Sequence, residues 1–157
     1  MEHKQLLTVF NSLPVGIGFF TADGTLVRCN ESFCRIFGAD SQTLLGNKLN
    51  INENSVVPDV VKEAVRRCVP VQMSFLYDFD KQRTDKRFFS TRTRTCYLKC
   101  NGNPLYDNDG KFVNYIFIFE DITETVKSEE VLRQSRRKTE LAMKAANIMF
   151  WEFDAVA

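Results

Sequence analysis

The sequence is poor in the residues on which most catalytic and metal sites depend. Its 157 residues include one histidine, His3, and five cysteines, none of which stands in a C-x-x-C pair. The common zinc-binding patterns are therefore missing, and a Ser/His/Asp triad cannot be built around a lone histidine beside the amino terminus. The sequence also has no glycine-rich phosphate-binding loop. We predict that this chain is not itself an enzyme and holds no metal ion.

Long apolar runs and a surplus of one charge are missing too. No apolar stretch approaches the roughly 18 residues of a membrane-spanning helix, and the first residues follow no signal-peptide pattern. With 21 basic and 20 acidic residues the net charge is +1, which gives no general affinity for nucleic acid or anionic membranes. The odd number of cysteines indicates reduced, mostly buried thiols. These features predict a cytoplasmic protein that binds no nucleic acid and does not insert into a membrane.

What the sequence does contain is an ordinary globular composition, 44% apolar and 26% charged, and one strongly patterned stretch. A strand is predicted over 95–106 and a second over 111–120, joined by a turn at Asp107-Asn108-Asp109-Gly110. Asp-Gly is a strong hairpin signal because glycine readily supplies the positive φ that the turn needs. Asp121 follows and is expected to cap a long charged helix, with Glu124 completing a capping box.

The rest of the chain divides into short elements by its apolar periodicity and its turn residues. In chain order we expect a helix over 2–12, a hairpin of strands 15–21 and 25–29, short helices beginning at Asn30 and Ser41, a helix from Asn54 or Ser55 to Cys68, a strand over 71–78 and a polar loop over 81–93. The last strand is apolar on both faces, with Phe117 on one and Ile118 on the other, as in the centre of a covered sheet. This order predicts an α+β fold with a five-stranded antiparallel sheet.

Several short motifs follow one another along the chain in a particular order. They are Ala22-Asp23-Gly24, Asn30-Glu31-Ser32-Phe33, Phe37-Gly38, Leu44-Leu45-Gly46, Asn103-Pro104-Leu105-Tyr106-Asp107, Asp109-Gly110 and Glu120-Asp121-Ile122-Thr123-Glu124. By their order and spacing, rather than by any single match, they resemble the PAS domain family from Leu6 to Thr139. The resemblance implies a PAS-like five-stranded antiparallel sheet with small helices on one face, an N-terminal flanking helix and a long C-terminal signalling helix.

The resemblance also divides the chain into parts. They are a flanking helix over 1–13, the PAS domain over 14–124, a helical linker over 125–140 and a final segment over 141–157. The final segment begins with helix-forming residues over 141–149 and continues with a strand-like stretch over 150–154, as the chain does over 6–23. We therefore expect the start of a second PAS repeat there, within a longer multi-domain protein.

In the family, the sheet and the small helices enclose a cavity for a small molecule, haem or flavin. The resemblance places these residues at its wall: Phe19, Phe33, Phe37, Val61, Val65, Met73, Phe75, Leu98, Cys100, Phe117 and Phe119. The alternative is a core that the same side chains fill, with no ligand. Histidine-ligated haem is not expected because His3 lies at the terminus, although cysteine ligation stays open. Photoactive flavin is not expected either, because Phe33-Cys34-Arg35 lacks the longer motif of light-sensing domains.

A basic segment with two aromatic residues follows the third predicted strand. It contains Lys81, Arg83, Lys86, Arg87, Arg92 and Arg94, together with Phe88 and Phe89. Charge combined with ring stacking is one way to hold an anionic ligand or nucleic acid. We favour a solvated loop instead, because Asp78, Asp80 and Asp85 offset the charge.

The residues Asp121, Ile122, Thr123 and Glu124 resemble the motif through which PAS domains pass a signal onward. The implied parent is a bacterial-type two-component sensor histidine kinase, or else a diguanylate cyclase or transcriptional regulator. The phosphoacceptor and ATP-binding motifs of a kinase are absent from this sequence.

The competing interpretation is a ligand-free interaction module. A homodimer through the flanking helices and outer sheet face would use Leu6, Phe10, Tyr97, Ile116 and Ile118, and neighbouring domains of the parent would be further partners.

Overall fold

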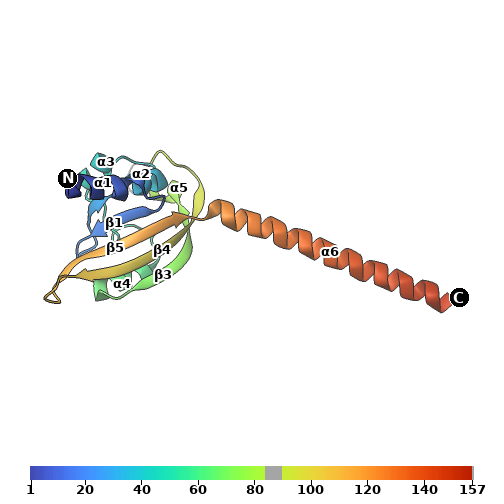
Figure 1. Ribbon diagram of the computed structural model, residues 1–157. Coiled ribbons are helices and arrows are strands. Elements are labelled where there is room, and N and C mark those ends of the chain that lie inside the picture. The colour runs from blue at the N-terminus through green and yellow to red at the C-terminus, as the bar shows by residue number, and fades with distance from the viewer. Residues whose placement is uncertain (84–89, 157) are drawn as a thin grey trace. The chain divides into compact units, whose positions relative to one another are not determined.

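The computed structural model describes residues 1–83 and 90–156, with the side chains of the last helix described as far as Ile148. The chain forms two units, Met1–Ile122 and a helix that begins at Thr123 (Figure 1). The elements are α1 (Glu2–Ser12), β1 (Gly16–Phe20), β2 (Leu26–Cys29), α2 (Glu31–Phe37), α3 (Ser41–Gly46), α4 (Asp59–Arg67), β3 (Val71–Asp78), α5 (Phe79–Arg83), β4 (Thr95–Tyr106), β5 (Phe112–Asp121) and α6 (Thr123–Val156). Among the described residues, none of these helices combines the length and apolar character that crossing a bilayer requires.

The strands form one antiparallel sheet in the order β2-β1-β5-β4-β3, which confirms the predicted five-stranded layer (Figure 1). In the central strand β5, Phe117 is paired with Gly18 of β1 on one side and with Gly102 of β4 on the other. These glycines leave space for aromatic rings, because a Cβ atom at Gly102 would lie 2.4 Å from Cε1 of Phe117. The predicted turn between β4 and β5 is also confirmed, with Gly110 at a φ of 76°.

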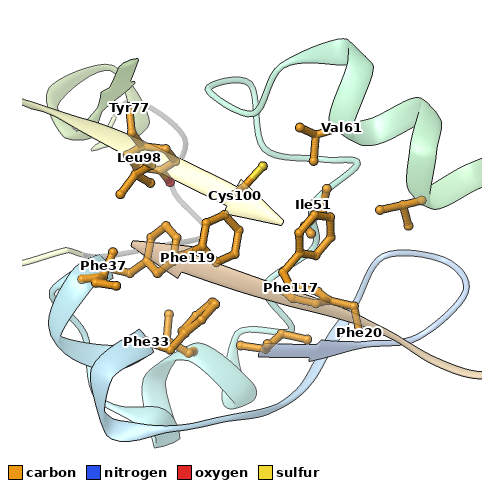
Figure 2. Packing of buried hydrophobic residues seen from close by; sticks show 14 of the residues in the cluster. Phe20, Phe33, Phe37, Ile51, Val61, Tyr77, Leu98, Cys100, Phe117 and Phe119 are labelled. Carbon is orange, nitrogen blue, oxygen red and sulfur yellow. The ribbon is translucent and has the colours of Figure 1, made fainter. Parts of the chain in front are cut away.

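The core lies between the sheet and helices α2, α3 and α4 (Figure 2). As predicted, β5 is apolar on both faces: Phe117 and Phe119 are buried in the core, whereas Ile118 is half-buried on the opposite face. Phe119 is packed edge-on by two rings of α2, with centroid distances of 5.8 Å to Phe33 and 5.3 Å to Phe37. Large aromatic side chains therefore occupy much of the volume in which the family resemblance implied a cavity.

The other face of the sheet receives α1 near β1. The Phe10 ring of α1 lies 6.0 Å from the Phe19 ring, and Phe19 is paired with the outward-facing Ile116. The predicted position of Phe19 at the cavity wall is therefore wrong, and the core residue is its neighbour Phe20, which is 1% exposed. The strand alternation was hidden because the inward positions before Phe20 are Gly16 and Gly18, which carry no side chain.

The predicted loop over 81–93 is in part helical. Helix α5 follows β3 directly and buries the side chains of Phe79 and Gln82. The first turn is supported by Asp78, whose Oδ1 accepts from the Lys81 N–H at 2.9 Å. Asp85, Lys86, Arg87, Phe88 and Phe89 lie outside the described residues, so the anion-binding alternative for this segment stays a prediction.

The predicted strand over 150–154 is wrong, because α6 continues as one helix to Val156. An isolated strand leaves its backbone N–H and C=O groups without sheet partners, whereas a helix satisfies them within itself. The helix-forming residues over 141–149 lead directly into this stretch, and the helix continues through it. The interpretation of 141–157 as the start of a second repeat stays a prediction.

Candidate sensing cavity and helix junction

The start of α2 is fixed by one buried amide. Asn30 is 1% exposed, and its Oδ1 accepts from the N–H groups of Ile17 at 2.8 Å and Phe33 at 2.9 Å. Its Nδ2 donates to the carbonyl oxygens of Phe10 at 3.0 Å and Val15 at 2.9 Å. The predicted cap at Asn30 is confirmed, and this side chain also ties α2 to β1 and to the end of α1.

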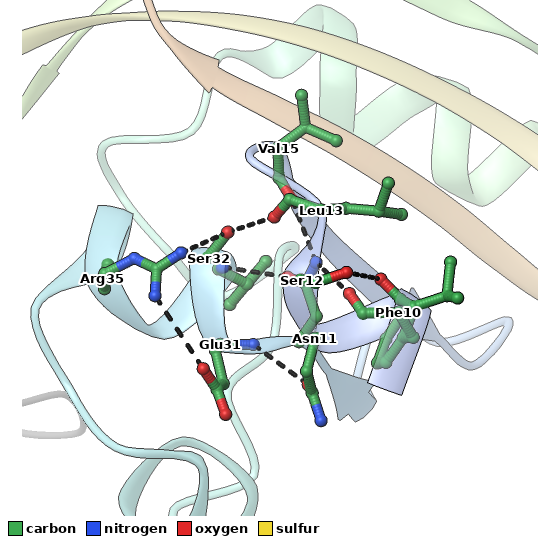
Figure 3. Close-up of polar contacts among 11 residues, drawn as sticks. Phe10, Asn11, Ser12, Leu13, Val15, Glu31, Ser32 and Arg35 are labelled. Carbon is green, nitrogen blue, oxygen red and sulfur yellow. Dashed lines mark hydrogen bonds and ion pairs between the residues drawn. The ribbon is translucent and has the colours of Figure 1, made fainter. Parts of the chain in front are cut away.

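Further polar contacts join α2 to the last turn of α1 and to the residue after it (Figure 3). The Ser32 hydroxyl donates to the Leu13 carbonyl oxygen, and Arg35 Nη2 donates to the Ser32 hydroxyl at 2.7 Å. The Glu31 N–H donates to Asn11 Oδ1 at 3.3 Å. Helix α2 is thus held at its N-terminal end, while its other end faces the cavity and the strand–helix junction described below.

A small cavity lies under α2 and α4, with a volume of about 30 Å³. Its wall consists of Phe20, Phe33, Phe37, Leu49, Asn50, Ile51, Asn54, Val57, Val61, Phe75, Tyr77, Gln82 and Phe119. Typical sites for small organic ligands measure roughly 300–1,000 Å³, whereas one water needs about 10–15 Å³. In this conformation the cavity therefore has room for a water molecule or two, and a larger ligand requires its wall to move.

One end of the cavity is polar. Asn54 Nδ2 donates to the Tyr77 hydroxyl at 3.0 Å, and burial raises the pKa of Tyr77 well above its ordinary value, so the phenol stays protonated. Gln82 is 3% exposed, and its Oε1 is buried with no hydrogen-bond partner among the residues that the structure describes. An unpaired buried acceptor is costly, so this oxygen favours a donor in the cavity.

The predicted wall residues divide into groups. Five of them line the cavity: Phe33, Phe37, Val61, Phe75 and Phe119. Four belong to the buried core and not to the cavity wall: Val65, Leu98, Cys100 and Phe117. Met73 is partly buried and packs against this core. Sequence reasoning missed the polar residues Asn54, Tyr77 and Gln82. For Tyr77 the strand alternation Met73, Phe75, Tyr77 was an available signal. Gln82 lies in a helix that was not predicted, so no signal pointed to it.

The second feature is a contact centre at Arg92. Its Nη1 donates to the Ile36 carbonyl oxygen at 2.8 Å, and its Nη2 donates to Asp121 Oδ2 at 3.0 Å. Its guanidinium carbon lies 4.9 Å from the centre of the Phe79 ring. One side chain thereby joins the last turn of α2, the start of α5 and the last residue of β5.

The residues before Arg92 are held to the same end of α2. Ser90 is 1% exposed, and its hydroxyl donates to the Phe37 carbonyl oxygen at 2.7 Å. The Thr91 N–H donates to the Gly38 carbonyl oxygen, also at 2.7 Å. Gly38 adopts φ of 65°, and a Cβ atom there would lie 2.7 Å from the Ser90 hydroxyl oxygen. Segment 90–92 therefore forms a strap across the end of α2.

The predicted exit residues lie at the end of β5 and the beginning of α6. Asp121 ends the strand and pairs with Arg92, and the Ile122 N–H donates to the Tyr97 carbonyl oxygen at 2.9 Å. Helix α6 starts at Thr123, so a single residue separates strand from helix. Glu124 Oε1 lies 3.8 Å from Lys127 Nζ within α6. The capping role of Asp121 and Glu124 stays a prediction.

The candidate interface residues have varied exposure. Leu6 is 67% exposed and Tyr97 is 39% exposed. Phe10, Ile116 and Ile118 are half-buried. The outer sheet face thus presents apolar side chains that α1 covers in part.

A five-stranded antiparallel sheet whose core is covered by short helices, and which leads directly into an exit helix, defines a class of small α+β domains. A family model described as the PAS fold matches residues 10–127, and the chain therefore belongs to this family. The family resemblance and the fold class inferred from the sequence are confirmed.

Solved structures include several with the same fold. An RNA-binding light-oxygen-voltage receptor has a TM-score of 0.64 and 17% identity, covering 88% of this chain, which spans only 38% of the receptor. The PAS domain of a protein from Colwellia psychrerythraea has a TM-score of 0.59 and 15% identity, covering 79% and 99% of the two chains. The PAS domain of a two-component sensor histidine kinase has a TM-score of 0.56 and 14% identity, covering 76% and 96%. A search of curated proteins finds no match.

Proposed function

We propose that this chain is the sensory module of a larger signalling protein, with a two-component sensor histidine kinase as the parent. The observation that carries the proposal is the contact of Arg92 with the end of α2 and with Asp121, one residue before α6 begins. Catalysis would belong to other parts of the parent, and the domain itself would lie in the cytoplasm. A cyclase or transcriptional regulator as the parent stays an alternative.

The proposed route begins at the cavity wall. Phe37 lines the cavity, and the carbonyl oxygen of its neighbour Ile36 accepts from Arg92. A ligand that enlarged the cavity would displace the last turn of α2 and with it an anchor of the Arg92 guanidinium. The change would then reach Asp121 through the ion pair.

The energy of the ion pair suits a switch. The side chains of Arg92 and Asp121 are 33% and 29% exposed, and ion pairs with access to solvent contribute at most about 1 kcal/mol. A ligand that favours the open arrangement by about 3 kcal/mol would therefore reverse the population of such a weak contact. We propose that the stimulus shifts Arg92 between a paired and an unpaired state.

Ligand binding is tested by native mass spectrometry and absorbance of the purified chain. A co-purified small mass or a chromophore band supports a ligand-sensing domain. Val57→Phe fills the cavity and should abolish that signal, because Val57 lies in its wall. Val60→Phe is the matched control, since Val60 lies three residues further along the chain, in α4, and is 64% exposed. Equal retention in both variants would contradict binding in this cavity.

A second candidate function is ligand-free dimerisation. It is favoured by the small volume of the cavity and by the apolar outer sheet face, where Leu76 is 49% exposed beside Tyr97. Analytical ultracentrifugation would then find an empty dimer that Ile116→Glu dissociates. Val60→Glu on α4 serves as the control and should leave association unchanged. A monomer at all concentrations would exclude this function for the chain.

A further inference from the structure

Two cysteines lie against each other at the junction of β2 and α2. Cys29 is the last residue of β2 and Cys34 is the middle residue of α2, and their Sγ atoms are 3.8 Å apart. Both residues are half-buried and pack against the edge of the core, so the pair is not enclosed within it.

The other thiols differ in their surroundings. Cys96 and Cys100 are buried at 1% and 0% exposure in the core. Cys68 is half-buried, and its thiol is directed to the Val65 carbonyl oxygen at 3.8 Å. Among the described residues, thiol-to-thiol contact is recorded for Cys29 and Cys34. Neither the ligand cavity nor the Arg92 contacts include either residue.

We propose that Cys29 and Cys34 form a reversible redox pair that exchanges with low-molecular-weight disulfides of the glutathione type. In the first step the Cys34 thiolate attacks one sulfur of the small disulfide, which forms a mixed disulfide and releases one small thiolate. In the second step Cys29 loses its proton to solvent and attacks the Cys34 sulfur, which releases the second small thiolate. Two protein thiols are oxidised and one small disulfide is reduced. The proposal does not depend on the signalling role.

The local structure favours closure of this bond. A disulfide has an S–S length of about 2.05 Å, so the two sulfurs, now 3.8 Å apart, must approach each other by less than about 2 Å. The backbone between them is already held, because the Asn30 N–H donates to the Ile17 carbonyl oxygen at 3.0 Å and the Cys34 N–H donates to the Asn30 carbonyl oxygen at 3.2 Å. The two cysteines therefore lie on either side of Asn30, the N-cap residue of α2, in a backbone that these hydrogen bonds fix.

The surroundings assign the order of attack and a slow rate. Burial, followed by the neighbouring Cys34 sulfur, raises the pKa of Cys29 to about 12. Burial also raises the pKa of Cys34, and the charges of Asp40 and Glu31 act in the same direction, while the hydrogen bond from Cys29 opposes them. We therefore assign the attack to Cys34, the less buried of the two thiols, and the resolving step to Cys29. Because the thiolate is the nucleophile, exchange at neutral pH is slow and becomes faster as pH rises.

The test uses the reduced, folded chain equilibrated with oxidised glutathione at about pH 8.5, where thiolate forms more readily. Intact mass and peptide mapping should find a link between Cys29 and Cys34 that dithiothreitol removes. Cys29→Ser should instead leave a glutathione adduct on Cys34, because the resolving thiol is missing. Cys68→Ser is the matched control and should form the link as the wild type does.

Three results would overturn the proposal. One is glutathione on Cys68 while Cys29 and Cys34 stay reduced. Another is separate, stable adducts on Cys29 and Cys34 with no link between them. The third is a disulfide between two copies of the chain in place of the internal one.

Discussion

At the scale of single residues, the domain depends on polar side chains with several partners each. Asn30 connects α1, β1 and α2 through its two amide atoms, and Arg92 connects α2, α5 and β5. A buried polar group with every partner in place adds specificity, whereas the loss of one partner leaves a costly unpaired group. Substitution of Asn30 or Arg92 should therefore destabilise the domain by more than the loss of a single contact would.

Asn30→Ala should lower the free energy of unfolding by about 2–4 kcal/mol, because it removes a helix cap and leaves buried backbone groups unpaired. Urea denaturation followed by circular dichroism measures this change. Asn103→Ala is the control, since Asn103 is exposed and its Nδ2 donates to Asn101 Oδ1. Its effect should stay within about 0.5 kcal/mol. Equal effects of the two substitutions would contradict the role assigned to Asn30.

The pH dependence of stability should show a contribution from Asp40. The backbone N–H of Thr43 donates to its Oδ1 at 2.7 Å, and this hydrogen bond lowers the pKa of Asp40 below its ordinary value of 3.8. The native state therefore favours the carboxylate, so the stabilisation is present above pH 3.8 and is lost as pH falls through the lowered pKa. The stability difference between wild type and Asp40→Asn should shrink between about pH 5 and pH 3. A difference that is constant over this range would contradict the assignment.

At the scale of elements, the central strand depends on its glycine neighbours. A Cβ atom at Gly102 would lie 2.4 Å from Phe117 and 2.8 Å from Tyr115. Gly102→Ala should therefore destabilise the domain by about 1–3 kcal/mol through forced movement of the rings. Gly46→Ala is the control, because a Cβ atom there has nothing within 4 Å. The melting temperatures of both variants test this prediction. A melting temperature of Gly102→Ala equal to that of the wild type would contradict it, because the rings would then move aside without cost.

Local patterns account for the parts of the fold that the sequence predicts. Asp109-Gly110 and the alternation around Phe117 are visible within a few residues, and so is the Asn30 cap. The contacts that build the junction are not local. The Ser90 hydroxyl donates a hydrogen bond to the carbonyl oxygen of Phe37, 53 residues earlier in the chain. No periodic pattern in the sequence predicts such a contact. The wall of the cavity was only partly predicted for the same reason, since its polar end comes from a loop, a strand and an unexpected helix.

At the scale of the whole molecule, the first unit ends at the point where its contacts converge. Its sheet, its helix α2 and the strap over 90–92 all reach Asp121 or the adjoining Arg92. The N–H of Ile122, the last residue of this unit, is bonded to the Tyr97 carbonyl oxygen. We propose that the state of Arg92 sets how firmly Ile122 is held before α6 begins.

Hydrogen exchange at the Ile122 amide, measured by NMR in a double-mutant cycle, tests this claim most directly. Arg92→Met and Asp121→Asn should each raise the exchange rate by up to about fivefold, the equivalent of about 1 kcal/mol. The double variant should exchange no faster than the single variants, because all three lack the same contact. Arg66→Met, which removes an exposed ion pair with Glu63, should leave the rate unchanged. Additive effects, or no effect of either substitution, would contradict the account.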